Sequence, residues 1–215
     1  MELSGKVCLV TGASRGIGRA TAEALVARGA VVAATASSIG HLADLDGVAS
    51  RHAADLADPA NAQGLAAEVL EEHGRVDVLV NDAAVRLDAL VAEATLEDVD
   101  RAFQVNALSP FLLAGALVEQ MAERGEGVVA NLVAPVVAPG RRGMGAYAAS
   151  KAALWSFTQT LRMEVGGRGV AVFGFDPGWV RTDLAPDGEE EAGPVAERLV
   201  AHLEAAPRKE REPLS

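Results

Sequence analysis

A short apolar run that leads directly into a glycine-rich turn constrains this chain most. Residues 7–10 form an expected buried strand, residues 11–18 carry three glycines, and a helix is expected over 19–28. Glycine lets the backbone approach a ligand closely, and the free N–H groups of a helix start attract negative charge. A second apolar run, 31–35, closes a βαβ unit. This context favours a dinucleotide-binding turn over an ordinary strand–helix corner.

Strands and helices alternate along the rest of the chain. Further strands are expected near residues 52–56, 76–80, 127–133 and 170–175, and helices near 61–73, 96–106, 110–124, 148–165 and 194–205. Nearly continuous apolar strands are typical of a parallel sheet covered by helices on both faces. The sequence therefore predicts an α/β fold with a doubly wound parallel sheet of six or seven strands. Because the last segment is helical, we expect the seventh strand to be absent or replaced.

Length and charge exclude several classes of protein. With 215 residues, half of them hydrophobic, the chain is expected to form a single domain over residues 1–215. A formal net charge of -11 repels nucleic acids and anionic membranes, so we expect neither as a partner. No uninterrupted apolar segment of membrane-spanning length and no signal-peptide core are found. The single cysteine, Cys8, has no disulfide partner, which fits a cytoplasmic setting, and we expect no metal site.

Tyr147, the only tyrosine, precedes Lys151 by one helical turn, so a helix would place both side chains on one face. An ammonium group beside a phenol favours the phenolate and would lower the pKa of the tyrosine from its usual value of about 10. Taken alone, the spacing also fits an exposed polar pair on a solvated helix. Together with the glycine turn, it indicates an acid–base pair close to a bound nucleotide.

Several motifs in matching order resemble the short-chain dehydrogenase/reductase family. They are the glycine turn, the pair Asp55 and Leu56, residues 81–84 (Asn-Asp-Ala-Ala), Asn106, the Tyr147-x-x-x-Lys151 pair, and residues 176–178 (Asp-Pro-Gly). The resemblance runs from about residue 6 to about residue 183, and the glycine turn is most similar to that of ketoacyl reductases. It implies a Rossmann fold and oxidoreductase activity with a nicotinamide cofactor.

The resemblance also implies roles for individual residues. Tyr147 would pass a proton to the substrate oxygen, Lys151 would hold the nicotinamide ribose, and Asn106 would hold a water molecule that connects the lysine to solvent. The implied cofactor-binding residues are Gly12, Ser14, Arg15, Gly16, Ile17 and Gly18 at the phosphates, Asp55 and Leu56 at the adenine, Asn81 and Ala83 at the adenosine ribose, and Tyr147, Lys151, Pro177, Gly178, Val180 and Thr182 towards the nicotinamide. Without the other motifs, Asp55 and Asn106 would also fit a strand-end turn and a helix-end polar residue.

Cofactor choice depends on the end of the second strand, which in NAD enzymes carries an acid that binds the ribose 2′-hydroxyl. Here that stretch is Thr-Ala-Ser-Ser over residues 35–38. Ser37 and Arg15 can meet a 2′-phosphate, so we expect NADP(H) in preference to NAD(H), which is not excluded. Arg15 also fits a solvent-facing side chain that lies over the turn.

The pattern breaks at the position of the family's catalytic serine, where this chain has Ala134. Loss of such a hydrogen-bond donor typically costs about 10²- to 10³-fold in rate. Three functions therefore stay open. The first is an NADP(H)-dependent reductase of a ketone or aldehyde, including ketoacyl or polyketide-type substrates, with Tyr147 as general acid. The second is a cofactor- or partner-binding protein with weak or no redox activity, and the third is a non-redox proton-transfer enzyme that uses Tyr147 and Lys151.

The substrate pocket and the oligomer are expected from less specific features. Residues expected to shape the pocket are Arg86, Leu87, Arg141, Arg142, Met144 and the loop 184–193. The three arginines can attract an anionic or carrier-bound substrate, or they can simply be exposed. The helix over 110–124 is apolar over more of its surface than one buried face requires, which favours a homodimer or homotetramer.

Overall fold

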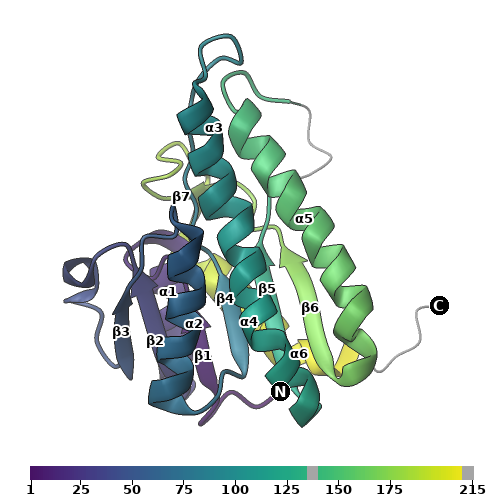
Figure 1. Ribbon diagram of the computed structural model, residues 1–215. Coiled ribbons are helices and arrows are strands. Elements are labelled where there is room, and N and C mark those ends of the chain that lie inside the picture. Colours follow the sequence, from purple (N-terminus) through teal and green to yellow (C-terminus); the bar gives the residue numbers. More distant parts are fainter. Residues whose placement is uncertain (135–139, 210–215) are drawn as a thin grey trace.

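The computed structural model describes residues 1–134 and 140–209, with side chains up to residue 206. Its centre is a six-stranded sheet in the order β3-β2-β1-β4-β5-β6, in which every neighbouring pair is parallel (Figure 1). The strands are β1 (Val7–Val10), β2 (Val31–Ala36), β3 (Ser50–Ala53), β4 (Val78–Asn81), β5 (Gly127–Leu132) and β6 (Val170–Phe175). The doubly wound α/β fold is confirmed, with six strands in this sheet among the described residues.

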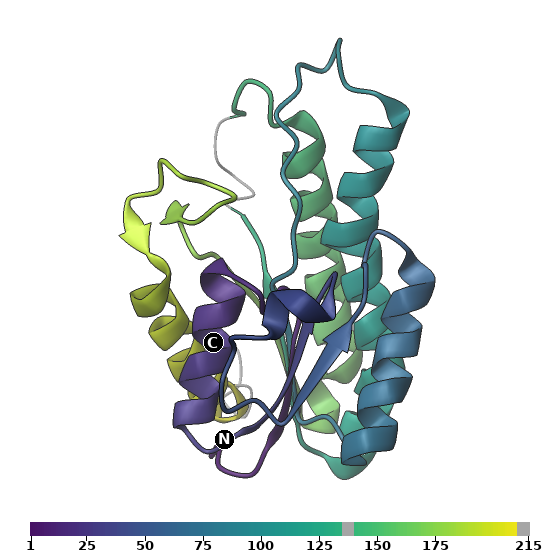
Figure 2. The same ribbon diagram turned by 90° about the vertical axis from the view of Figure 1, so that its left-hand side faces the viewer.

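Helices cover the sheet on both faces, as the side view in Figure 2 shows. α1 (Gly16–Ala27) and α6 (Ala192–Lys209) lie on one face, and α2 (Pro59–His73), α4 (Ser109–Arg124) and α5 (Gly145–Val165) lie on the other. Alternate residues of β1 enter the two separate cores, with Cys8 and Val10 in one and Val7 and Leu9 in the other. Burial from both sides explains why the strands are continuous apolar runs.

The segment 96–124 is one extended helical path rather than two separate helices. α3 (Leu96–Phe103) continues through a π-helical turn, η2 (Gln104–Leu108), into α4. By length and composition alone this 29-residue path could cross a membrane, although 56% of its apolar window is buried inside the protein. A core helix of a soluble protein passes the same test, so the finding is weak evidence for a membrane span.

The strand order reverses beside β1, which lies between β2 and β4. Ligands of such sheets bind outside the carboxyl ends of the strands at this switch point. The chain after β6 folds over the same edge, where β7 (Val180–Arg181) pairs in parallel with β8 (Glu190–Glu191). Two short helices, η1 (Ile39–Leu42) and η3 (Gly166–Arg168), complete the elements. The topology thus brings loops from both halves of the chain to one edge.

Gly18 is required by close packing beneath the glycine turn. A Cβ atom there would overlap the carbonyl of Gly12 and the carboxylate of Asp82, whereas a Cβ at Gly64, inside α2, would meet open space. We expect Gly18→Ala to lower the free energy of unfolding by about 1–3 kcal/mol. The matched Gly64→Ala should raise it by about 0.5–1 kcal/mol, because alanine is the better helix former. Urea unfolding measures both, and equal effects would contradict the packing argument.

Candidate active site

Two adjoining cavities lie at the carboxyl edge of the sheet. The first has a volume of about 290 Å³ and the second about 270 Å³. The residues that line both are Ile17, Asp82, Ala84, Thr182 and Leu184. Because these walls are shared, the cavities form one elongated cleft across the switch point.

The second cavity is built on the glycine turn and on the ends of β2 and β3. Ten of the predicted cofactor-binding residues line it, namely Gly12, Ser14, Arg15, Gly16, Ile17, Ser37, Asp55, Leu56, Ala83 and Thr182. Gly12 and Gly16 have φ angles of 70° and 58°, in the left-handed region that favours glycine. α1 begins at Gly16, so the N-terminus of this helix meets the cavity. Such a helix start attracts a phosphate group.

Two arginines border this second cavity. The guanidinium group of Arg15 lies 3.3 Å from a carboxylate oxygen of Asp183, and both side chains are largely exposed. Arg101 of α3 also lines the cavity, although no sequence motif pointed to it. Its helix is far along the chain from the glycine turn, so only the fold brings the two together. Both arginines offer donors for an anionic ligand.

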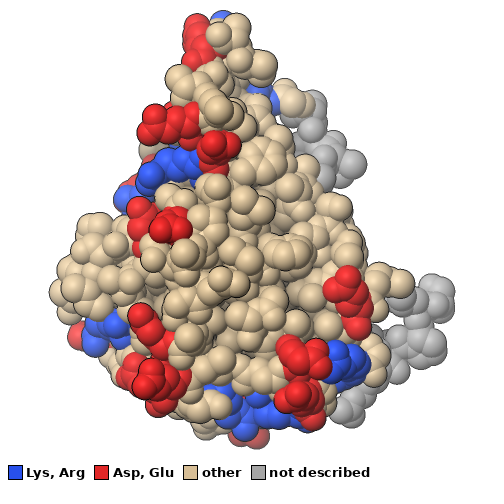
Figure 3. All heavy atoms as spheres, in the orientation of Figure 1, with Lys and Arg blue, Asp and Glu red and all other residues tan. Residues whose placement is uncertain are grey.

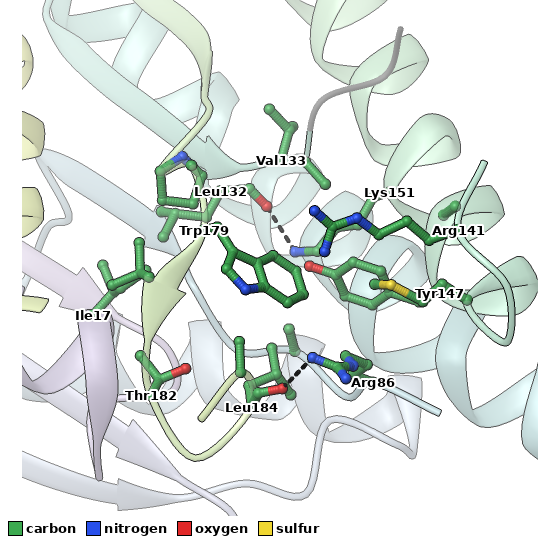
Figure 4. Close-up of a pocket in the computed structure, with 18 of the residues that line it drawn as sticks. Ile17, Arg86, Leu132, Val133, Arg141, Tyr147, Lys151, Trp179, Thr182 and Leu184 are labelled. Atoms are coloured by element: carbon green, nitrogen blue, oxygen red, sulfur yellow. Dashed lines mark hydrogen bonds between the residues drawn. The ribbon is translucent and has the colours of Figure 1, made fainter. Parts of the chain in front are cut away.

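Tyr147 and Lys151 line the first cavity from successive turns of α5. Lys151 is 4% exposed, and its Nζ donates a hydrogen bond of 2.7 Å to the carbonyl oxygen of Leu132, the last residue of β5. The same Nζ lies 6.0 Å from the centre of the Tyr147 ring. Figure 4 shows the hydroxyl end of Tyr147 pointing into the cavity. The predicted pair is therefore brought together at one wall.

The acidity of this tyrosine differs from the sequence-based expectation. Burial, together with the nearby negative charge of Asp82, raises the pKa of Tyr147 to about 12, and the positive charge of Arg86 opposes this rise. Burial also lowers the pKa of Lys151 and raises that of Asp82, and the attraction between their charges opposes both changes. The expectation that the phenol is more acidic than usual was wrong, because desolvation and the carboxylate of Asp82 outweigh the one cation that lowers the pKa, which is Arg86. At neutral pH Tyr147 keeps its proton.

Asn106 lies in the π-helical turn and is fully buried, without lining either cavity. Its Oδ1 accepts a hydrogen bond of 2.8 Å from the backbone of Val85, and its Nδ2 donates to the carbonyl of Val85 and to Ser150 Oγ, each at 2.9 Å. The side chain thus ties the loop after β4 to α5. Its implied role in holding a water molecule stays a prediction. Single π-helical turns inside α-helices are frequent at functional sites.

Asn81 and Gly18 also lie outside the cavity walls. Asn81 Nδ2 donates to Asn131 Oδ1 at 2.8 Å, and Asn131 in turn donates to Thr158 Oγ1 at 2.9 Å. This buried chain links β4, β5 and α5. The side chain of Asn81 is therefore on the face of the sheet that α5 covers, bonded to the neighbouring strand. Its implied contact with a ribose stays a prediction.

The remaining predicted residues, Pro177, Gly178 and Val180, line the first cavity together with Thr182. Ala134 stands on the same wall. Among the described residues of this cavity, only Tyr147 and Thr182 carry hydroxyl groups. No serine from elsewhere in the described chain replaces the missing one.

Trp179 is the main side chain of this cavity that the sequence analysis missed. Its ring lies between two guanidinium groups, with Arg141 at 4.2 Å and Arg86 at 5.4 Å from the ring centre (Figure 4). Arg86 also donates to the carbonyl of Leu184 at 2.8 Å. A tryptophan directly after the Asp-Pro-Gly segment was a visible signal. Trp179 gives the first cavity a large apolar surface.

The predicted pocket residues divide into two groups. Arg86, Arg141, Met144 and Leu184 line the first cavity, as does Ala185 from the predicted loop, whereas Leu87 and Arg142 do not. The predicted loop 184–193 is shorter in the structure, because β8 and the first residues of α6 lie within it. Residues 184–189 are held by backbone bonds, including one of 2.8 Å from Glu189 N–H to the carbonyl of Trp179. The loop and Trp179 are therefore fixed relative to each other.

Comparisons with known proteins agree with this geometry. A family model described as short chain dehydrogenase matches residues 6–192. The chain belongs to the short-chain dehydrogenase/reductase family. This is a family of oxidoreductases that use a nicotinamide cofactor and act on small-molecule substrates.

Individual relatives carry different names. The chain is 36% identical to the 3-oxoacyl-[acyl-carrier-protein] reductase FabG of Escherichia coli over 212 residues, which covers 96% of this chain and 87% of the relative. It is 38% identical to a D-threitol dehydrogenase of Mycolicibacterium smegmatis over 190 residues, covering 85% and 73%. A metagenomic short-chain oxidoreductase solved in complex with NADP superposes with a TM-score of 0.86 at 32% identity, covering 99% of this chain and 95% of that one.

Asp82 should tune the acidity of Tyr147, since its charge raises the pKa values of both Tyr147 and Lys151. Asp82→Asn keeps the shape of the side chain and removes the charge, so both pKa values should fall. Reduction needs a protonated phenol, and the alkaline decline of kcat should therefore begin at lower pH than in the wild type. A pH–rate profile of carbonyl reduction measures this shift. The exposed Asp46→Asn is the matched control, and an unmoved profile in Asp82→Asn would refute the tuning role.

Proposed function

We propose that this protein is an NADP(H)-dependent reductase of ketones or aldehydes. The observation that carries the proposal is the protonated Tyr147, which faces an apolar cavity joined to the cleft of the glycine turn. A proton donor beside a nucleotide cleft is the arrangement that carbonyl reduction needs. A nicotinamide cofactor, when bound, supplies the hydride.

The residues of the chain have distinct tasks in this proposal. Tyr147 donates its phenolic proton to the carbonyl oxygen of the substrate. Lys151, held by the carbonyl of Leu132, offers its remaining N–H donors to ribose hydroxyl groups and keeps a positive charge near the phenol as it loses its proton. Trp179 and Met144 exclude water from the reacting centre.

The preference for NADP(H) rests on the second cavity. The end of β2 there presents Thr35, Ala36 and Ser37, with no acid that would repel a 2′-phosphate. Arg15 can exchange its exposed partner Asp183 for a phosphate, because an exposed ion pair is worth little. The solved relative in complex with NADP supports the same choice.

For the substrate, we propose a carbonyl compound with an apolar body, of the ketoacyl or polyketide type. The walls of the first cavity are mainly apolar, from Leu132, Val133, Met144 and Trp179. Arg141 lies over Trp179 and can meet an anionic or carrier-bound group, whereas Arg86 is already paired with Asp88 through two hydrogen bonds. The printed name of the E. coli relative supports this class, whereas that of the D-threitol dehydrogenase represents a polyol alternative.

We further propose a cytoplasmic homodimer or homotetramer that uses α4 and α5. Phe111 is 51% exposed, Trp155 36% and Met163 83%, and the ring of Phe111 lies 4.7 Å from that of Phe157. Charged side chains are few on the central part of this face, between clusters at its rim (Figure 3). Exposed aromatic surface of this kind favours association with a second copy.

Tyr147→Phe tests the reductase directly. Loss of the proton donor should lower the rate of substrate-dependent NADPH oxidation by about 10²- to 10⁴-fold. NADPH binding, measured by fluorescence titration, should remain, because the glycine turn is untouched. Phe103→Leu, at the end of α3 and outside both cavities, is the aromatic control. Turnover that survives in Tyr147→Phe would overturn the assignment of the general acid.

Ala134 favours a second candidate, a nucleotide-binding protein with weak redox activity. Ala134→Ser restores a hydroxyl at the cavity wall, and we expect the rate with simple ketones to rise by about 10²-fold. Steady-state NADPH oxidation measures this, with Ala152→Ser on the same cavity as the control. A rate that does not change would show that the missing donor does not limit the reaction. Substrate conversion without cofactor oxidation would instead identify a proton-transfer enzyme.

A further inference from the structure

A cluster of metal-binding side chains lies at the edge of the sheet. His52 comes from β3, and Glu72 and His73 come from the last turn of α2. Each offers one ligand atom, and these atoms all lie within 4.8 Å of one another. None of the three lines either cavity of the cleft. The cluster is therefore a feature that the reductase chemistry does not use.

The ring of His52 has a carboxylate near each nitrogen. Its Nδ1 lies 3.4 Å from Glu68 Oε2, and its Nε2 lies 3.6 Å from Glu72 Oε2. With Nδ1 facing Glu68, Nε2 is the ring nitrogen nearest to Glu72 and to Ser50 Oγ. A metal ion bound on this side of the ring could take both Nε2 and the Glu72 carboxylate as ligands. Histidine ligands of metals commonly have such a carboxylate on the other nitrogen.

Ser50 lies within hydrogen-bond distance of the Nε2 atoms of both histidines. Its Oγ lies 2.9 Å from His52 Nε2 and 2.7 Å from His73 Nε2. A hydroxyl has a single proton, so it can donate to only one of these nitrogens at a time. Ser50 and His52 are both buried on the same side of β3, facing α2. Both imidazoles are thus positioned by the fold rather than by chance on an open surface.

The distances suit a small tetrahedral ion. Zinc bonds to histidine nitrogen and carboxylate oxygen are about 2.0–2.2 Å long, which places neighbouring ligand atoms roughly 3.3–3.6 Å apart. His52 Nε2 and Glu72 Oε2 already have this separation. Glu72 is half exposed, so its side chain can turn to close the set. A site with two imidazoles and one carboxylate binds zinc in preference to calcium or magnesium.

We propose that His52, Glu72 and His73 form a binding site for a divalent transition-metal ion of the zinc type, with Glu68 orienting His52. The bound ion would join β3, the edge strand of the sheet, to the end of α2. β3 leads directly to Asp55 and Leu56, which line the nucleotide cavity. The metal would therefore stabilise the strand that supports this end of the cleft.

The test uses the untagged full-length protein after treatment with a chelator. Isothermal titration with Zn²⁺ should give one site per chain, and Co²⁺ should give the visible absorption of a tetrahedral complex. Zn²⁺ should also raise the thermal unfolding midpoint. His73→Gln and Glu72→Gln, both outside the tightly packed core, should lose the Co²⁺ spectrum. Glu68→Gln should bind about 10- to 100-fold more weakly, as expected for a residue that orients a ligand.

His41→Gln is the matched control, because His41 is exposed and outside the cluster. It should bind the metal as the wild type does. Circular dichroism in chelator establishes that each variant is folded. The proposal would be overturned by the absence of a stoichiometric site, or by equal Zn²⁺ affinity in wild type, His73→Gln and Glu72→Gln.

Discussion

The arrangement of the cleft depends on the interactions that the buried ammonium group of Lys151 makes with the protein. A charge withdrawn from water is tolerated only where polar partners replace the solvent. Here the partners are the carbonyl at the end of β5 and the opposite charge of Asp82, which lies at the junction of the two cavities. Because Lys151 must reach both, α5 is fixed against the carboxyl edge of the sheet. Tyr147, one turn earlier on this helix, is thereby placed at the cavity wall.

The same burial decides which form of the phenol the protein presents. The sequence showed an ammonium and a phenol at helical spacing and suggested an acidified tyrosine. In the structure, the ammonium points to the carbonyl of Leu132, and desolvation raises the pKa of Tyr147. A protonated phenol in a poorly solvated site is a ready proton donor for a carbonyl oxygen that gains negative charge. In the proposed reductase, this resting form is the one that donates a proton to the substrate.

The fold was largely predictable, because burial of the sheet on both faces leaves a local signature in each strand. The glycine turn and the Tyr147–Lys151 pair were also local, since each depends on residues within one turn of helix or loop. Trp179, which was missed, did have a local signal, since it directly follows the Asp-Pro-Gly segment. Arg101 and the electrostatic role of Asp82 were missed for the opposite reason, because they arise from contacts between distant segments. His52 and His73 belong to the same class, because only the packing of α2 on β3 brings their rings to one serine. Spacing along a chain does not reveal contacts between distant segments.

Because residue 134 is alanine rather than serine, Tyr147 would be the main hydrogen-bond donor to a substrate carbonyl in the proposed reductase. In the described wall of the first cavity, the hydroxyl groups belong to Tyr147 and Thr182 alone. A carbonyl oxygen bound there depends mainly on the phenol for its hydrogen bond. The surrounding apolar side chains strengthen that bond, because a low dielectric increases the electrostatic attraction between donor and acceptor. In the proposed reductase, an apolar substrate that fills the space beside Trp179 would exclude water from this oxygen and so offset part of the lost donor.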